Sequence, residues 1–203
     1  MKASRSGGCA ALVLLALVVG GCHASRPAAA SGDRLSVDRL YPLRAGSVWT
    51  YDVDTGDGSA PTLAITRVTK SAGGKAEVSS GGAPIEYEQR PDGLYRGDRG
   101  IYVFKLPLRP GATWETSGGA SAQVVTLDKQ LETPAGPFAG CVEVLESGGS
   151  VPKLVRTVFC PDVGPVEVES SVALPVAGSQ ARVVARLRGY DFSGALQPTL
   201  PAN

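Results

Sequence analysis

Few residues in this chain have the types and spacing that chemistry requires. Its 203 residues include one histidine, His23, which lies near the N-terminus and far from the regularly patterned segments. A Ser-His-Asp or Cys-His catalytic set therefore cannot form in a downstream domain. The sequence also lacks a Gly-x-Ser-x-Gly nucleophile elbow and a phosphate-binding loop with Gly-Lys-Ser/Thr. A zinc site would need a histidine to join Cys141 and Cys160 as a ligand, and His23 is the only one. Because His23 lies beside Cys22, far from the patterned segments, we expect no zinc or other metal site.

Two carboxylate pairs are the remaining catalytic candidates. Glu86 with Glu88, and Glu167 with Glu169, are spaced so that each pair lies on one face of a strand. A glycosidase uses two neighbouring carboxylates, but exposed strand faces carry such residues routinely. We therefore expect no enzymatic activity and no cofactor, and a hydrolase is the least favoured alternative.

The N-terminal segment has the three-part pattern of a bacterial export signal. Lys2 and Arg5 give a positive start, residues 10–19 are apolar, and two glycines precede Cys22. The apolar run is shorter than the roughly 20 residues that a transmembrane helix needs. A cysteine directly after small residues resembles the lipobox of bacterial lipoproteins. In that class the signal is cleaved before the cysteine, which is then acylated.

The lipobox resemblance implies a signal peptide over residues 1–21 and a lipid anchor at Cys22. Two or more acyl chains give stable membrane attachment. Positions 23 and 24 hold His and Ala, not the aspartate of inner-membrane retention in enteric bacteria. The expected location is thus the outer membrane, on its periplasmic face or at the cell surface. An ordinary secretory cleavage with Cys22 incidental is the alternative.

The mature chain divides into a tether, one domain and a tail. Residues 22–35 form the acylated cysteine and a flexible tether, which spans roughly 20 Å. Residues 36–193 form an all-β domain, and residues 194–203 a flexible tail. Removing the signal takes away two basic residues and leaves 18 basic against 19 acidic, a net charge near −1. This balance gives no electrostatic footprint for nucleic acid.

Apolar and polar residues alternate from Trp49 onward, whereas helical spacing is almost absent. Glycine-rich and proline-rich turns separate the alternating segments. Near the end, glutamates of residues 166–174 and arginines of residues 181–188 can pair across a hairpin on its wet face; an anion-binding stripe is the less favoured interpretation. The other expected strands are 49–53, 62–69, 76–79, 85–89, 93–96, 101–106, 114–116, 123–130, 142–145 and 154–159.

Cys141 and Cys160 are the only cysteines left after Cys9 is lost with the signal and Cys22 is acylated. One cysteine pair in an exported protein is a candidate disulfide. The turn at residues 147–150 joins two β-rich runs. If residues 150 and 151 flank the hairpin centre, the two cysteines face each other within disulfide range. A redox-active pair is the alternative, but the Cys-x-x-Cys spacing is absent.

Three segments of the sequence carry recognisable boxes. They are Y-P-L-x-x-G-x-x-W-x-Y at residues 41–51, P-A-G-x-F-x-x-C at 134–141 and P-x-V-G-x-V at 161–166. Together they resemble a group of uncharacterised bacterial secreted proteins and lipoproteins. The resemblance implies an all-β fold made of one strongly curved antiparallel sheet, or an open half-barrel, as in periplasmic lipid or lipoprotein carriers. A β-sandwich is the alternative.

Two non-enzymatic functions remain open. The domain could be a binding or scaffolding module that contacts another envelope protein. Alternatively, the curved sheet could hold a lipid or other hydrophobic ligand on its concave face. The candidate lining residues for such a ligand are Trp49, Tyr51, Ile65 and Tyr102, which could equally fill a core.

Overall fold

The computed structural model describes residues 35–150, 152–173 and 180–193. The predicted signal peptide, Cys22, the tether up to residue 34, the turn at 175–179 and the tail at 194–203 lie outside the described residues. Leu35 was predicted to end the tether, but it packs against the hydrophobic core.

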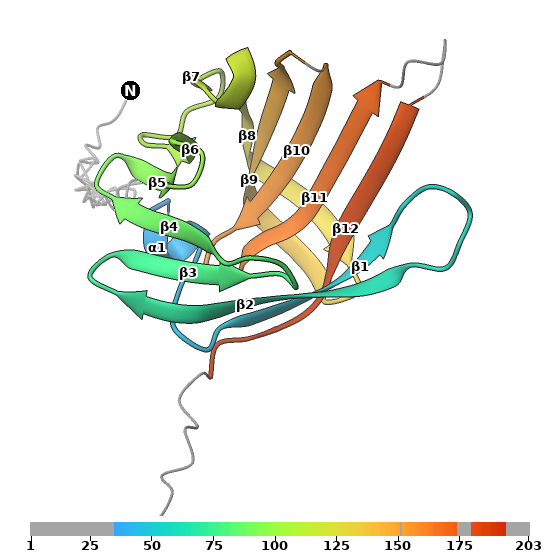
Figure 1. Ribbon diagram of the computed structural model, residues 1–203, viewed down its shortest axis with the longest axis horizontal. Coiled ribbons are helices and arrows are strands. Elements are labelled where there is room, and N and C mark those ends of the chain that lie inside the picture. The colour runs from blue at the N-terminus through green and yellow to red at the C-terminus, as the bar shows by residue number, and fades with distance from the viewer. Residues whose placement is uncertain (1–34, 151, 174–179, 194–203) are drawn as a thin grey trace, which may run out of the picture.

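The domain is one antiparallel sheet of twelve strands, curved into a nearly closed barrel (Figure 1). This confirms the predicted all-β fold with a single strongly curved sheet rather than a β-sandwich. Each of the expected strands is present, most of them longer than predicted. The strands are β1 (Val48–Asp54), β2 (Thr62–Ala72), β3 (Lys75–Ser79), β4 (Ile85–Arg90), β5 (Gly93–Arg96), β6 (Ile101–Lys105), β7 (Thr113–Glu115), β8 (Ala120–Thr133), β9 (Gly136–Gly148), β10 (Lys153–Cys160), β11 (Gly164–Ala173) and β12 (Gln180–Asp191).

Two meanders of six strands make up the sheet. The strand order is β6-β5-β4-β3-β2-β1-β12-β11-β10-β9-β8-β7, so β1 and β12 join the two halves. At the opposite side, the indole Nε1 of Trp114 on β7 donates to the carbonyl of Tyr102 on β6 over 3.1 Å. This bond links the two ends of the sheet and brings the barrel close to closure.

The curvature has a local cause in the strand pairing. Register shifts interrupt five strand pairs: β1–β12, β2–β3, β5–β6, β8–β9 and β10–β11. Each such irregularity bends its strand and increases the local twist. Tight turns shorten the connections. Between β2 and β3, for example, Gly73 and Gly74 both have positive φ, which a two-residue hairpin turn requires.

A short helix and a group of aromatic side chains close one end of the barrel. The helix α1 (Val37–Leu40) was not predicted, and it buries Leu40 completely. The ring of Tyr41 packs edge-on against Trp49 at 5.3 Å, and Phe104 packs the same way against Phe159. Edge-to-face pairs of this kind stabilise a core beyond their area alone. A 3-10 turn, η1 (Ser117–Gly119), precedes β8.

The predicted hairpin register and disulfide are present. Lys153 pairs with Gly148 and Phe159 with Val142, so β9 and β10 have the predicted register. The Cys141–Cys160 bridge lies one step further, with the two Cα atoms 4.3 Å apart. Both cysteines are buried in the hydrophobic core.

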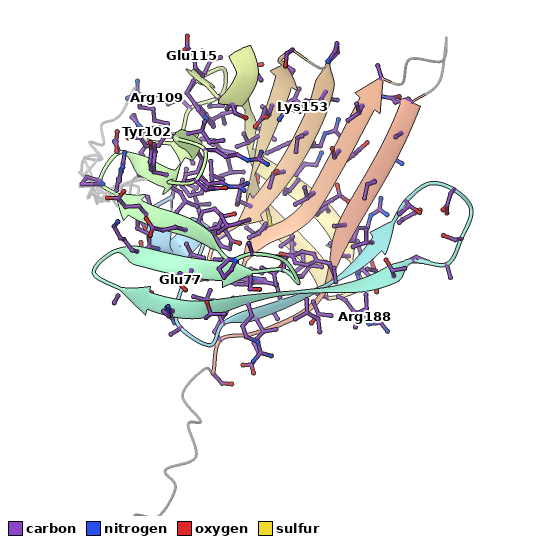
Figure 2. All side chains as sticks on the ribbon, in the orientation of Figure 1. Glu77, Tyr102, Arg109, Glu115, Lys153 and Arg188 are labelled. Atoms are coloured by element: carbon purple, nitrogen blue, oxygen red, sulfur yellow. A yellow bond between two sulfur atoms is a disulfide. The ribbon has the colours of Figure 1, made fainter. Side chains whose placement is uncertain are left out.

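The outer face of β11 and β12 carries the predicted ion pairs. Arg186 lies 3.0 Å from Glu167, and Arg182 lies 2.6 Å from Glu169. Next to them, Arg188 pairs with Asp52 of β1 at 2.8 Å and is labelled in Figure 2. Each of these arginines pairs with a carboxylate, as predicted for a charge-paired exposed face.

Candidate functional site

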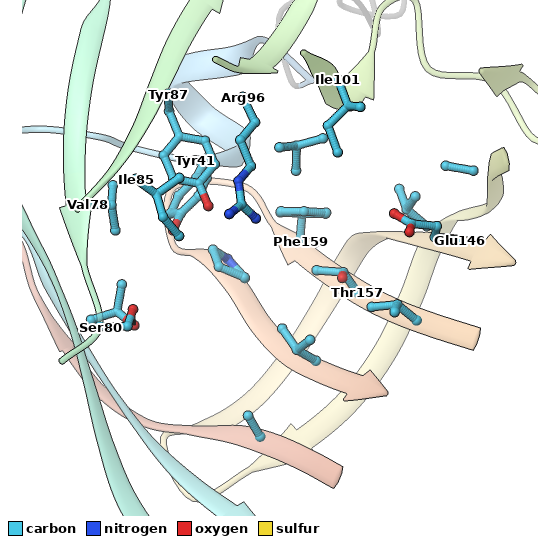
Figure 3. Close-up of a pocket in the computed structure, with 18 of the residues that line it drawn as sticks. Tyr41, Val78, Ser80, Ile85, Tyr87, Arg96, Ile101, Glu146, Thr157 and Phe159 are labelled. Carbon is cyan, nitrogen blue, oxygen red and sulfur yellow. Dashed lines mark hydrogen bonds between the residues drawn. The ribbon is translucent and has the colours of Figure 1, made fainter. Parts of the chain in front are cut away.

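A cavity of about 430 Å³ lies inside the curved sheet. Its size falls within the range of about 300–1,000 Å³ that is typical of small-molecule sites. Inward-facing residues from both meanders line it, and Figure 3 shows part of this lining. The cavity exists because small side chains alternate with large ones on the inner face, and Ala64, Ala122 and Ala185 leave the space open.

The wall formed by β9, β10 and β11 is mainly apolar. Val144, Val155 and Val168 line it, and Phe159 lies at its closed end. The register of β9 with β10 places Val144, Val155 and Phe159 on one face, as predicted. Apolar contacts of this kind favour a ligand that removes them from water. One ion pair interrupts the wall, between Lys153 and Glu146 at 2.5 Å.

The opposite wall carries a group of polar side chains, which we call the Tyr-Arg cluster: Tyr41, Tyr87 and Arg96. Tyr87 on β4 and Arg96 on β5 are direct cross-strand partners, so they lie on the same face. The ring of Tyr41 lies 5.7 Å from that of Tyr87. Figure 3 shows the guanidinium of Arg96 beside these rings, pointing into the cavity.

Arg96 is held in place by Asp98. Its Nε and Nη2 atoms donate to the two carboxylate oxygens of Asp98, at 2.7 and 2.9 Å. A two-point bond of this kind fixes the plane of the guanidinium. Its hydrogen bond with Asp98 raises the pKa of Arg96, and the same contact lowers the pKa of Asp98. Arg96 therefore stays charged, and its Nη1 takes no part in these two bonds.

Tyr41, Tyr51 and Tyr87 are neutral hydrogen-bond donors at physiological pH. Burial raises the pKa of Tyr41 well above its ordinary value. Burial also raises the pKa of Tyr87, although nearby Arg96 opposes the shift. The hydroxyl of Tyr51 already donates to the carbonyl of Pro165 at 2.8 Å. No such bond is found for the hydroxyls of Tyr41 and Tyr87 within the described part of the chain.

The four predicted lining residues have different positions. Tyr51 and Tyr102 line the cavity, although the hydroxyl of Tyr102 is taken up by Asp92 at 2.7 Å. Trp49 is completely buried below the cavity and does not line it. The placement of Ile65 was wrong: it is 49% exposed on the outer face, where it pairs with Thr50.

The error at Ile65 has a simple cause. Strand alternation separates two faces but does not say which one turns inward. On β2, the small residues Ala64 and Thr66 face the cavity, and the apolar Leu63 and Ile65 face outward. Sequence reasoning also missed Tyr87 and Arg96, because the alternation of Tyr87 with Glu86 and Glu88 does not show which face of the strand turns inward.

The carboxylates considered for hydrolysis are all ion-paired in the structure. Glu86 lies 3.2 Å from Lys75, and Glu88 lies 2.7 Å from Arg90. Glu167 and Glu169 are bonded to the arginines of β12. The hydrogen bond from Arg90 lowers the pKa of Glu88, and that from Arg182 lowers the pKa of Glu169. A general acid needs a raised pKa, whereas the pKa values of Glu88 and Glu169 are lowered.

The described residues contain no group of three or more His, Cys, Asp or Glu residues arranged to hold a metal ion. Among the same residues, no helix is long and apolar enough to cross a membrane.

Comparison with known proteins gives a likeness of fold. No protein-family model and no curated protein matches the sequence. A protein from Bacteroides fragilis, provisionally described as exported and as having a YmcC-like fold, superposes with a TM-score of 0.50 at 15% identity. That match covers 75% of this chain and 99% of the other. A provisionally described lipoprotein from Parabacteroides distasonis gives a TM-score of 0.41 at 11% identity, over 75% of this chain and 98% of that one. The likeness to the protein from Bacteroides fragilis concerns the fold alone.

Proposed function

We propose that this protein is a lipid-anchored envelope protein that binds a hydrophobic or amphipathic ligand inside its curved sheet, without catalysing a reaction. The cavity of about 430 Å³ is the observation that carries the proposal. The sheet packs apolar and aromatic residues into a core and leaves only part of its inner face lining an open space, which a completely filled core would not. Apolar walls with a few convergent polar groups are typical of small-molecule sites.

Two features support the location. The lipobox-like segment that ends at Cys22 is the expected anchor. The Cys141–Cys160 bridge is of the kind that persists in oxidising compartments outside the cytosol. A Cys22→Ala variant should then leave the membrane fraction and appear in the soluble envelope fraction. Continued partition with membranes would contradict the anchor.

Ligand binding can be tested by filling the cavity. Ala64→Phe places a large ring in the cavity from β2, and Ala72→Phe makes the same change on the same strand at an exposed position outside the lining. Binding of an uncharged apolar probe, hexadecanol, should be lost in Ala64→Phe and kept in Ala72→Phe. Equal binding by the two variants would contradict a ligand inside the sheet. Their melting temperatures show whether each is folded.

An envelope-protein partner remains a second candidate, because the outer face of β2 exposes two large apolar side chains. Leu63 is 59% exposed and Ile65 is 49% exposed, and they are two residues apart on one face. The double variant Leu63→Ser/Ile65→Ser should still bind the ligand. It should lose its contact with a partner protein if that contact is made by the outer face of β2. Site-specific crosslinking from position 65 in intact cells, compared with crosslinking from Thr69 on the same strand, tests this candidate.

A further inference from the structure

Tyr41 presents its hydroxyl to the cavity. Its side chain is 6% exposed and lines the cavity, and its hydroxyl has no hydrogen-bond partner among the described residues. That oxygen is not among the buried unpartnered polar atoms of the described residues, which are Thr116 Oγ1 and Arg156 Nε, so it is open to the cavity. It is therefore available to donate to an acceptor on an occupant of the cavity.

Tyr87 repeats this pattern beside it. Its hydroxyl also lacks a partner within the described residues, and the two rings are 5.7 Å apart. Neutral phenols donate one hydrogen each. Two donors on one patch of wall suit an acceptor group with more than one oxygen atom.

The charge of the cavity has the sign that such an acceptor needs. Its charged lining residues are Arg96, Arg99, Lys153 and Glu146, and the last two pair with each other. Arg96 pairs with Asp98, and no ion pair involves Arg99 among the described residues. Two arginines against one aspartate leave a net charge of +1 beside the tyrosines. An anion placed there would gain charge-assisted hydrogen bonds in a partly desolvated site.

We propose that the cavity selects single-chain amphiphiles with an anionic head group, a carboxylate or a phosphate, which the Tyr-Arg cluster binds. This inference rests on the proposed ligand-binding function and adds the class of ligand. The head group is held by the hydroxyls of Tyr41 and Tyr87 and by the Nη1 of Arg96, which takes no part in the two bonds to Asp98. The hydrocarbon chain lies along the valine wall on the opposite side. A cavity of about 430 Å³ suits one chain rather than two.

The test compares ligands that share one chain and differ in the head group: palmitate, hexadecyl phosphate and hexadecanol. The wild-type protein should bind the two anions about 10- to 100-fold more tightly than the alcohol, since hydrogen bonds to charged groups contribute about 1.5–3 kcal/mol. Arg96→Gln should remove most of this preference and leave hexadecanol binding unchanged. Arg188→Gln, which removes a paired arginine from the outer face, is the matched control and should keep the preference.

The outcomes separate this inference from the proposed function. If none of the three probes binds, the ligand-binding function itself is wrong. If hexadecanol binds as tightly as the anions, the cavity binds ligands but the head-group selection is wrong. If inorganic phosphate competes as strongly as hexadecyl phosphate, the site takes a free anion and the amphiphile is wrong. Should Arg96→Gln also lose hexadecanol binding, the double variant Tyr41→Phe/Tyr87→Phe decides; it must lower palmitate affinity and spare hexadecanol.

Discussion

The indole Nε1 of Trp49 donates to the carbonyl of Val163 over 2.7 Å, across 114 residues of sequence. This bond joins the first sequence box to the third. Gly164, the next residue, has a φ of +101°, and a Cβ there would lie 3.2 Å from the same indole nitrogen. The disulfide links the second box to the third through Cys141 and Cys160. The three boxes therefore meet at the closed end of the barrel, where they specify the fold.

Replacing Trp49 should destabilise the closed end. Trp49→Phe leaves the Val163 carbonyl without its donor and creates a void around a completely buried side chain. We expect a loss of about 2–4 kcal/mol in the free energy of unfolding, measured by urea denaturation. Tyr190→Phe, at a position that is 45% exposed, should change it by less than about 0.5 kcal/mol. Similar effects of the two changes would contradict this role of Trp49.

The strands and one register were predictable because their signals are local. Alternation marked the twelve strands, and the turn at residues 147–150 fixed the pairing of β9 with β10. The inward face was not predictable for β2, because Leu63 and Ile65 turn outward and the cavity residues are Ala64 and Thr66. The helix α1 is only four residues long, too short for periodicity to reveal.

The Tyr-Arg cluster was beyond sequence reasoning for a different reason. Tyr41 precedes β1, while Tyr87 and Arg96 belong to short strands four and five. Only the curvature of the sheet brings Tyr41 beside Tyr87, and that curvature depends on register shifts that leave no clear trace in the sequence. Tyr87 and Arg96 are neighbours because of the register between β4 and β5. The turn between these two strands did not define that register by itself.

The link between Trp114 and Tyr102 should hold the two edge strands together. Trp114→Phe keeps an aromatic ring but removes the donor to the Tyr102 carbonyl. Amide hydrogens of β6 should then exchange faster, by a factor of about 2–10 for a bond that contributes 0.5–1.5 kcal/mol. Amides of β10, in the middle of its half of the sheet, serve as the internal control. Unchanged exchange in β6 would show that other contacts close the barrel.

Reduction of the disulfide should lower stability without changing the fold. The bridge joins residues 19 apart in sequence, and in the chain-entropy model such a loop contributes about 3 kcal/mol. The double variant Cys141→Ala/Cys160→Ala should unfold at a lower urea concentration while its circular dichroism stays that of a β protein. A midpoint equal to that of the oxidised wild type would contradict a stabilising bridge. Adding a reductant should shift the wild type and leave the double variant unaffected.

Asp162 should contribute to acid sensitivity through its contact with α1. Arg39 bonds to both carboxylate oxygens of Asp162, and this lowers the pKa of Asp162 from its ordinary value of 3.8. A lowered folded-state pKa means that the contribution is present above pH 3.8 and is lost as the pH falls through the folded-state value. Asp162→Asn should therefore show a shallower loss of stability with falling pH over that range. Asparagine tolerates the positive φ at this position, so the backbone is preserved.

Control substitutions check that this pH dependence of stability is due to Asp162. Asp191 also has a lowered pKa, caused by its hydrogen bonds with Ser193, but it does not contact α1. Arg39→Gln should reproduce the pH profile of Asp162→Asn, whereas Asp191→Asn should not release α1. Hydrogen exchange of Leu40 and Tyr41 reports the helix directly. Identical acid profiles for the wild type and Asp162→Asn would contradict the assignment.

The most direct test of the central claim is native mass spectrometry of the protein isolated from its own membranes. We expect one small molecule bound per protein chain, with one hydrocarbon chain and an anionic head group. The same molecule should be absent from Ala64→Phe and present in Ala72→Phe. A wild-type protein that carries no small molecule, and takes up none of the three hexadecyl probes, would contradict a ligand-binding cavity.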